Sequence, residues 1–276
     1  MRVAVVGLGA MGSRIAGRLL ERTNEVVVWN RDRSKVETLL ARGAGVAETP
    51  AAAAAEAEAT ITMVADPEAL RDVTEGPHGA AAGLAPEATL IQMSTVSPEA
   101  ISRLATLVPG ALLDAPVLGS ISEAEAGTLK IFVGGPPELV KGRRALLEDL
   151  GRVIHVGGVG AGTAAKLVAN TTLVGVIGVL GEALAAADAL GLERETAFEV
   201  LGVTPLAEQA KRRRAAFESA DYPPRFALRL ARKDADLVLA ASGRELKLTR
   251  AAREWLAEAE EAGAADYSAV LARIVD

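Results

Sequence analysis

The feature that most constrains the fold is a glycine-rich turn directly behind the first apolar run of the chain. Residues 3–6 are typical of a short buried strand, and Gly7, Gly9 and Gly12 follow in the spacing GxGxxG. Apolar residues then recur every four positions over 11–19, which predicts an amphipathic helix. Glycines alone can form a purely structural turn, but between a strand and a helix they allow backbone and helix N-terminus to approach a pyrophosphate. We therefore predict that this region binds a dinucleotide.

The chain changes character near residue 157. Over 2–156, short β-branched runs alternate with helical patterns, which is typical of βαβ units on a parallel sheet. The expected strands are 3–6, 26–29, 60–64, 89–93, 112–113, 129–133 and 153–156. Beyond residue 157 the patterns are helical only, beginning with a long helix that runs to about residue 190. We predict an α/β protein with an N-terminal Rossmann dinucleotide-binding domain (1–160) and an all-α C-terminal domain (161–276), joined by the long helix.

Composition and charge exclude several kinds of site and partner. The formal net charge of −6 argues against a nucleic acid or an anionic membrane as partner. The chain has no cysteine, which excludes disulfides, thiolate metal sites and a cysteine nucleophile, and no metal site is expected. The uncharged run over 167–181 is shorter than the roughly 20 residues of a membrane span, so it is interpreted as a buried helix. We expect a cytoplasmic protein that acts on a small molecule.

The residues behind the second expected strand bear on the choice of dinucleotide. In NAD-binding versions of this fold, a carboxylate about 20 residues beyond the glycines receives the ribose hydroxyls. Here Asn30 and Arg31 follow the strand, and a guanidinium can hold a 2′-phosphate by charge-assisted hydrogen bonds. NADP(H) is therefore expected in preference to NAD(H), with Arg33 as a weaker phosphate ligand. Asp32 keeps NAD(H) open, because a shift of one residue would place a carboxylate near the ribose.

A nicotinamide enzyme that moves hydride to or from a carbonyl also needs a proton donor for the oxygen. Lys166 and Asn170 lie four residues apart near the start of the long helix, hence on one face. The positive end of the helix dipole disfavours a charged lysine there. By itself, such a pair is also common on helix surfaces. His78 and His155 lie in a turn and at a strand end, and both are expected to be solvated or structural.

Taken in order, these segments resemble the β-hydroxyacid dehydrogenase family, which includes 3-hydroxyisobutyrate dehydrogenases and glyoxylate and succinic semialdehyde reductases. The resemblance covers nearly the whole chain. The segments that carry it are GLGAMGSRIAGRL (7–19), Ser94 to Val96, DAPVLGS (114–120), GVGAGTAAKLVAN (158–170), and Phe226 with Lys233 and Asp234.

The resemblance implies a role for each segment. Lys166 would be the general acid or base and Asn170 would orient the substrate, while a small hydroxyacid and its aldehyde or semialdehyde interconvert. The substrate would be bound by Leu118, Gly119, Ser120, Phe226 and Asp234. The cofactor would be bound by Gly7, Leu8, Gly9, Ala10, Met11, Gly12, Asn30, Arg31, Arg33, Thr95 and Lys233. The direction of the reaction in the cell, and whether Asp234 pairs with Lys233 or Lys166, stay open.

Leu118 departs from the family pattern. The family usually carries a serine there, whose hydroxyl helps to hold the substrate carboxylate. Leucine forfeits a hydrogen bond to a charged group that is worth about 1.5–3 kcal/mol, although Ser120 could compensate. The substrate is therefore left open, and a less polar or bulkier carbonyl compound is compatible with this turn.

Two other functions share some of these features. An NADPH-dependent imine reductase has the same fold and cofactor site, but such enzymes typically carry another residue where Lys166 stands. A non-catalytic NADPH-binding protein would have no need for Lys166, Asn170 and Asp234 together. Glycines at 175, 178 and 181 recur every third residue of the long helix and would let another helix approach closely. A homodimer or homotetramer through the helical domain is therefore expected.

Overall fold

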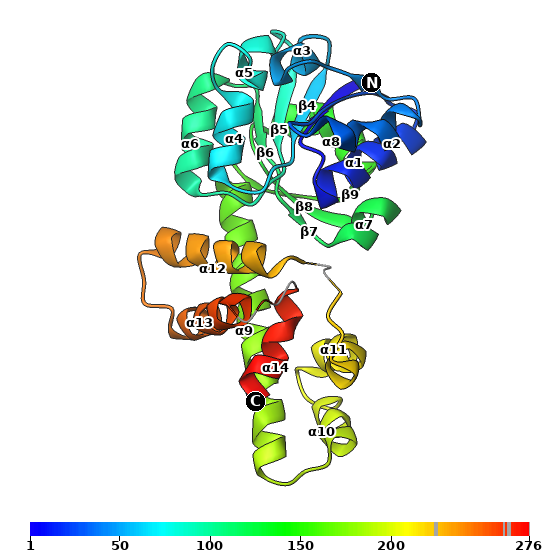
Figure 1. Cartoon of the computed structure of the whole chain (residues 1–276). Coiled ribbons are helices and arrows are strands. Elements are labelled where there is room, and N and C mark those ends of the chain that lie inside the picture. Colours follow the sequence, from blue (N-terminus) through cyan, green and yellow to red (C-terminus); the bar gives the residue numbers. More distant parts are fainter. Residues whose placement is uncertain (224–225, 262, 264–265, 276) are drawn as a thin grey trace. The chain divides into compact units, whose positions relative to one another are not determined.

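The computed structural model describes residues 1–223, 226–261, 263 and 266–275, and it divides into two compact units. The N-terminal unit is Met1–Lys166 and the C-terminal unit is Leu167–Asp276 (Figure 1). The predicted fold class is confirmed, because a mostly parallel sheet with helices is followed by helices alone. Residue 276, the last of the predicted C-terminal domain, lies outside the described residues.

The N-terminal unit is built on a nine-stranded sheet in the order β3-β2-β1-β4-β5-β6-β8-β7, with β9 paired to β8. The strands are β1 (Arg2–Val6), β2 (Glu25–Trp29), β3 (Gly45–Val46), β4 (Ala59–Thr62), β5 (Thr89–Gln92), β6 (Leu112–Asp114), β7 (Val117–Leu118), β8 (Leu129–Gly134) and β9 (Gly151–Gly157). The central strand β1 pairs in parallel with β2 and β4. The carboxyl ends of β1, β4, β5 and β6 therefore meet at one edge.

One part of the sheet differs from the prediction of parallel strands throughout. Strand β8 runs antiparallel to both β6 and β7. The residues between Leu118 and Leu129 are too few for a crossover, which needs a dozen or more, so β8 returns beside β7 in the opposite direction. Strands β3 and β7, of two residues each, were not predicted.

Helices cover both faces of the sheet in the N-terminal unit. They are α1 (Ala10–Glu21), η1 (Arg33–Val36), α2 (Glu37–Leu40), α3 (Pro50–Ala55), α4 (Pro67–Thr74), α5 (Ala80–Gly83), α6 (Pro98–Leu107), α7 (Ile121–Ala126) and α8 (Pro137–Glu148). One core cluster joins the sheet to α1, α7 and α8, and a second joins it to α3 through α6. Helices α3, α4 and α6 each begin with proline behind a capping side chain, which explains why these short segments are helical.

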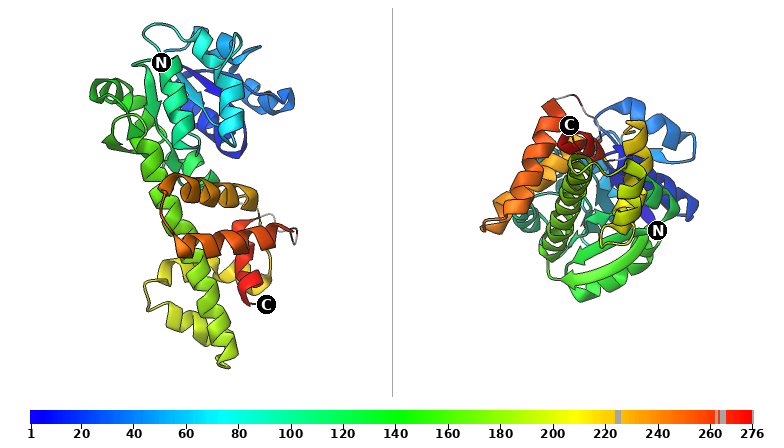
Figure 2. Two further views of the ribbon diagram at one scale, coloured as in Figure 1. Left: turned by 90° about the vertical axis from the view of Figure 1, so that its left-hand side faces the viewer. Right: turned by 90° about the horizontal axis from the view of Figure 1, so that it is seen from below.

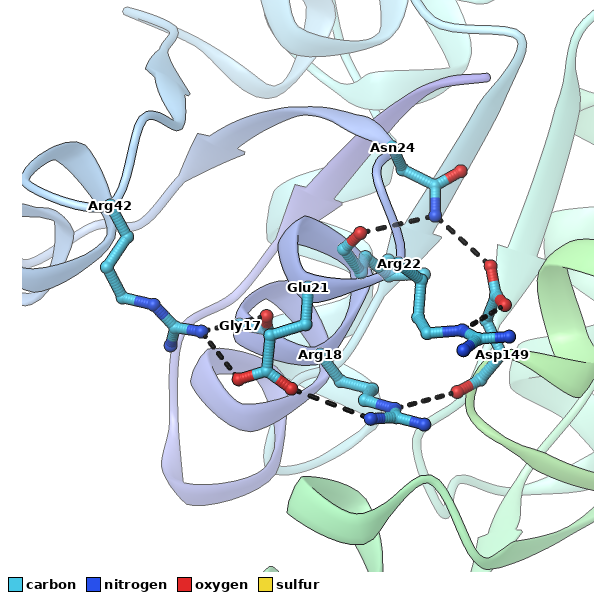
Figure 3. A network of polar contacts seen from close by, with 8 residues as sticks. Gly17, Arg18, Glu21, Arg22, Asn24, Arg42 and Asp149 are labelled. Atoms are coloured by element: carbon cyan, nitrogen blue, oxygen red, sulfur yellow. Dashed lines mark hydrogen bonds and ion pairs between the residues drawn. The ribbon is translucent and has the colours of Figure 1, made fainter.

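A polar network holds the C-terminal end of α1 in place (Figure 3). The side chains of Arg22 and Asn24 donate to the two carboxylate oxygens of Asp149 at 2.9 and 3.2 Å. Arg18 donates to the backbone carbonyl of the same residue at 3.2 Å. From the other side, Arg42 donates to the carboxylate of Glu21 at 2.9 Å. The helix that carries the glycine turn at its N-terminus is thus fixed at its far end.

The C-terminal unit packs around α9 (Ala161–Ala189), whose residues before Leu167 belong to the N-terminal unit. The other helices are α10 (Arg194–Leu201), α11 (Ala207–Ser219), α12 (Leu228–Ser242), α13 (Lys247–Glu261), η2 (Tyr267–Ala269) and α14 (Val270–Val275) (Figure 2). Among the described residues, α9 is the one helix long and apolar enough to cross a membrane. Half of its most apolar stretch is buried, and Val174, Ile177, Leu180 and Leu184 lie in the core of this unit, so the prediction of a buried helix holds for one side of α9.

The glycines of α9 accommodate other helices of the same chain. A Cβ built on Gly178 would lie 2.8 Å from the ring of Trp255 in α13, and one built on Gly181 would lie 2.6 Å from Ile274 in α14. The predicted close approach of a neighbouring helix is therefore met within the chain. It follows that these glycines give no argument for a second copy.

We predict that Gly178→Ala destabilises the protein by about 1–3 kcal/mol, because overpacking the tight contact with Trp255 forces side chains to shift. Gly142→Ala in α8 is the matched control, since no atom lies within 4 Å of its added Cβ. Alanine there should stabilise the helix by about 0.5–1 kcal/mol. Urea denaturation measures both changes, and equal effects of the two substitutions would contradict the packing argument.

Candidate functional site

The glycine turn has the geometry that a bound pyrophosphate requires. Gly7 follows β1 with a φ of 98°, and its N–H donates to the carbonyl of Trp29 at 2.9 Å. A Cβ built on Gly12 would lie 1.9 Å from the carbonyl oxygen of Gly7, so helix and turn are in backbone contact. No atom lies within 4 Å of a Cβ built on Gly9, and no side chain caps the N-terminus of α1 there. Space and unsatisfied N–H groups for an anion therefore coincide.

Asn30 braces this turn from the end of the second strand. Its Oδ1 accepts the N–H of Leu8 at 2.8 Å, and its Nδ2 donates to the carbonyl of Asp32 at 2.9 Å. Sequence reasoning had placed Asn30 beside the ribose and had not found this bracing contact. The amide thus connects the turn that would hold the pyrophosphate to the loop that would hold the ribose.

The charged groups behind Asn30 differ in their availability. Asp32 caps η1 by accepting from the hydroxyl and the N–H of Ser34, and these hydrogen bonds lower the pKa of its carboxyl. Arg33 pairs with the carboxylate of Glu48 and donates to the carbonyl of Ala47. Arg31 is exposed, and the described residues offer its guanidinium no hydrogen bond or ion pair. Of the three, Arg31 is the group most available to a ligand.

The segment with Thr95 follows β5 at the carboxyl edge of the sheet. The buried Gln92 side chain holds the backbone of Ser94 through the N–H and, at 3.0 Å, through the carbonyl. The hydroxyl of Ser94 accepts the N–H of Val64, which follows β4, at 2.9 Å. Because β1, β4 and β5 are parallel neighbours, this rigid segment lies on the same edge of the sheet as the glycine turn.

The segment from Leu118 to Ser120 is tied to its own helix. Leu118 ends β7, and Gly119 has a φ of 143°. Both the N–H and the hydroxyl of Ser120 donate to one carboxylate oxygen of Glu123, at 2.7 and 2.6 Å, in a capping box for α7. Hydrogen bonds from Ser120 lower the pKa of Glu123 to about 2. The N–H and the hydroxyl of Ser120, a residue that the sequence analysis assigns to substrate binding, therefore already donate to an ionised carboxylate.

Lys166 lies on the first part of α9, which a buried carboxylate attaches to the sheet. Asp114 at the end of β6 accepts from the N–H of Thr163 at 2.7 Å and from its hydroxyl at 2.8 Å. Burial raises the pKa of Asp114, against the effect of its hydrogen bonds from Thr163 and Gly160. Sequence reasoning missed this contact. The available signal was that Asp114 is the sole charged residue of the stretch 104–122.

In the C-terminal unit, Asn170 and Lys233 meet at one carboxylate. The Nδ2 of Asn170 donates to Oδ2 of Asp234 at 2.8 Å, and Nζ of Lys233 lies 3.0 Å from Oδ1. Pairing between Lys233 and Asp234, one of the two alternatives, is thus observed. Because a carboxylate only accepts, the amide must direct its NH₂ toward Asp234. Its Oδ1 is buried and accepts no hydrogen bond from any described residue.

Phe226 lies in the same unit as part of a separate contact. Its ring packs edge to face against Tyr267, with the centroids 5.3 Å apart. Its N–H donates to the carboxylate of Asp266 at 2.9 Å. These contacts fix the residue in place.

Two family models match almost the whole chain. The first, described as the NAD binding domain of 6-phosphogluconate dehydrogenase, matches residues 2–158. The second, described as NAD-binding of NADP-dependent 3-hydroxyisobutyrate dehydrogenase, matches residues 160–274. The two matches meet where the turn of residues 157–160 precedes α9.

Individual relatives are similar over their full length. Glyoxylate/succinic semialdehyde reductase 1 of Arabidopsis thaliana is 32% identical and is covered to 97%, with 98% of this chain aligned. A solved structure of the 3-hydroxyisobutyrate dehydrogenase of Mycobacterium tuberculosis with L-serine has a similar fold, with a TM-score of 0.90. The two sequences are 28% identical, and the alignment covers 100% of this chain and 99% of that one. An imine reductase of Streptomyces aurantiacus is also 28% identical, at a TM-score of 0.63 with 99% of each chain covered.

Proposed function

Because the chain belongs to the β-hydroxyacid dehydrogenase family, we propose that it is an NADP(H)-preferring enzyme that interconverts a small hydroxyacid and its aldehyde or semialdehyde. It is an oxidoreductase with a nicotinamide dinucleotide cofactor. The observation that carries the proposal is the glycine turn, which offers open space and an uncapped helix N-terminus to an anion. The two family models, which match almost the whole chain, support it. The resemblance assigns the proton transfer to Lys166.

The proposed preference for NADP(H) rests on the availability of charges behind Asn30. The carboxylate of Asp32, which would favour ribose hydroxyls, is held through its Oδ1 as the cap of η1 by two hydrogen bonds from Ser34. The positive charge of Arg33 is offset by Glu48, whereas Arg31 is exposed and can approach a 2′-phosphate. NAD(H) is the less favoured cofactor on these grounds.

We predict that Arg31→Ala lowers kcat/KM for NADPH by about 10- to 100-fold, the equivalent of one hydrogen bond to a charged group, and leaves kcat/KM for NADH unchanged. Arg33→Ala is the matched control and should have a smaller effect, since Glu48 already neutralises that guanidinium. Steady-state rates with both cofactors measure the ratio. Equal rates with NADH and NADPH in the unmodified protein would refute the preference.

The proposed chemistry assigns separate tasks to Lys166 and Asn170. The bound nicotinamide would supply or accept the hydride. Lys166 would donate a proton to the carbonyl oxygen during reduction and remove it during oxidation. Asp234 orients the amide of Asn170, and the amide oxygen, left without a described partner, can accept a hydrogen bond from the substrate hydroxyl. Phe226 and Lys233 would complete the substrate and cofactor contacts.

The turn of residues 118–120 offers few free hydrogen-bond donors to a substrate carboxylate. Leu118 has no hydrogen-bonding side chain, and both donors of Ser120 hold the carboxylate of Glu123. A substrate carboxylate would have to displace this internal anion or bind beside it. Ser120 is therefore a poorer substitute for the usual serine than its position alone indicates, and a less polar carbonyl group stays compatible with the turn.

We predict that the protein oxidises NADPH with a short aldehyde such as glyoxylate or succinic semialdehyde, and that Lys166→Ala lowers kcat by about 100-fold or more. NADPH binding, followed by fluorescence titration, should survive that substitution. Lys141→Ala, an exposed lysine of α8, is the control and should leave both unchanged.

The substrate panel for this test includes succinic semialdehyde, its methyl ester and a cyclic imine. Turnover of imines alone would favour the imine reductase alternative. NADPH binding without any turnover would instead favour a non-catalytic protein. Faster turnover of the ester would indicate that Leu118 and Glu123 disfavour a carboxylate.

We also propose that the protein forms a homodimer or homotetramer through its C-terminal unit. Val168 and Val179 are 67% and 38% exposed, and their spacing of three helical turns places them on one face of α9. Val200 and Val203, near the end of α10, are also exposed. We propose that these exposed apolar side chains form the contact surface between the copies.

We predict that light scattering detects an oligomer and that Val168→Glu combined with Val179→Glu shifts it toward the monomer, because the charges would be buried in the interface. Leu107→Glu in α6 is the control and should keep the assembly intact. A monomeric unmodified protein at assay concentration would refute the proposal.

A further inference from the structure

We propose that Asp114 is a positioning residue for Lys166 and acts through Thr163. The inference rests on the proposed role of Lys166 in proton transfer. Asp114 is the first residue of the segment 114–120, which resembles the substrate-binding turn. Its carboxylate, however, accepts hydrogen bonds from α9 and would not contact the substrate. Asp114 is fully buried and holds α9 through the two hydrogen bonds to Thr163 described above.

Asp114 belongs to the same rigid frame as the glycine turn. It is paired in parallel with Gln92 of β5, and the ladder continues through β4 to β1. Strand β1 ends at the residue before Gly7. A group attached to Asp114 therefore has a fixed place relative to the turn that would hold the cofactor.

The contact with Thr163 fixes both the position and the rotation of the first turn of α9. One carboxylate oxygen accepts from the backbone and the other from the side chain of the same residue, so the helix cannot turn about its axis without breaking a bond. The backbone contact is close, because a Cβ built on Gly162 would lie 2.1 Å from the carbonyl oxygen of Asp114. Lys166 follows Thr163 by three residues, roughly one helical turn.

The charge at this position needs an explanation other than helix capping. Threonine and serine cap α3 and α6 without a charge, and the carboxylate of Asp66, which caps α4, is only partly buried, whereas Asp114 is fully buried. A carboxylate in this buried position costs stability, because it has left water. Its two oxygens, however, accept the N–H and the hydroxyl of Thr163 separately, so that the two bonds hold the helix at two different points. The arrangement therefore favours a precisely placed helix over a merely stable one.

The experiment compares four variants by kcat, KM for NADPH and thermal stability, on whichever carbonyl of the panel is reduced. Thr163→Val removes the hydroxyl bond, and Asp114→Ala removes both bonds to Thr163 together with the one from Gly160. Thr163→Ser keeps both bonds, and so does Asp114→Asn, whose amide can accept from the N–H and donate to the hydroxyl. We expect kcat to fall about 10-fold or more in the first two, because small displacements of a reacting group are costly, with KM for NADPH unchanged. The last two should stay close to the unmodified protein.

Thr49→Val separates positioning from stability. It removes the hydroxyl that caps α3, a helix that carries no proposed site residue, so it should lower thermal stability and leave kcat unchanged. A decrease of kcat in Thr49→Val equal to that in Thr163→Val would overturn the proposal. The proposal also fails if Asp114→Asn is as slow as Asp114→Ala, since charge and not geometry would then matter.

Lys166→Ala, measured in parallel, separates the positioning role from the proposed function. If Lys166→Ala is inactive while Thr163→Val and Asp114→Ala keep full kcat, the positioning role is wrong and the proposed function stands. If Lys166→Ala turns over normally, or no carbonyl of the panel is reduced, the proposed function is wrong and the positioning role fails with it.

Discussion

The backbone contact between Gly12 and Gly7 is the constraint on which the arrangement of the N-terminal unit depends. It brings the first turn of α1 against the end of the central strand, where any side chain on Gly12 would meet a carbonyl oxygen. The position of α1 then determines where its free N–H groups point. Asn30 holds the turn from β2, and Asp149 holds the other end of the helix (Figure 3). Strand, helix and glycine turn are thus fixed together.

The sequence was sufficient for the class of fold and for the large elements, because buried strands and amphipathic helices leave periodic patterns over many residues. It was insufficient for β3 and β7, of two residues each, and for the direction of β8. That direction depends on the length of a connection and on the pairing of a single residue of β6, neither of which a local pattern reports. The glycines of α9 were identified as a packing face, but the pattern could not say that α13 and α14 of the same chain fill it.

For the candidate site, spacing and charge were sufficient for the glycine turn, whereas Lys166 and Asn170 depended on the family resemblance. The reason is physical: a lysine and an asparagine one turn apart are compatible with many helix surfaces. The partners that give such side chains a defined place come from distant parts of the chain, as Asp234 does for Asn170 and Asp114 does for Thr163. The occupation of Ser120 by Glu123 was also beyond reach, since a local capping box and a substrate contact use the same donors.

The bracing amide of Asn30 has a consequence for how cofactor choice can evolve. An aspartate at this position would keep the bond from the N–H of Leu8, but its second oxygen would face the carbonyl of Asp32, to which the amide now donates. Two acceptors would then oppose each other in the loop. A lineage that exchanges one dinucleotide for the other by this single replacement must therefore also reshape the backbone of residues 30–34. A change of cofactor preference by this route therefore requires changes in the whole loop of residues 30–34 and not in one side chain alone.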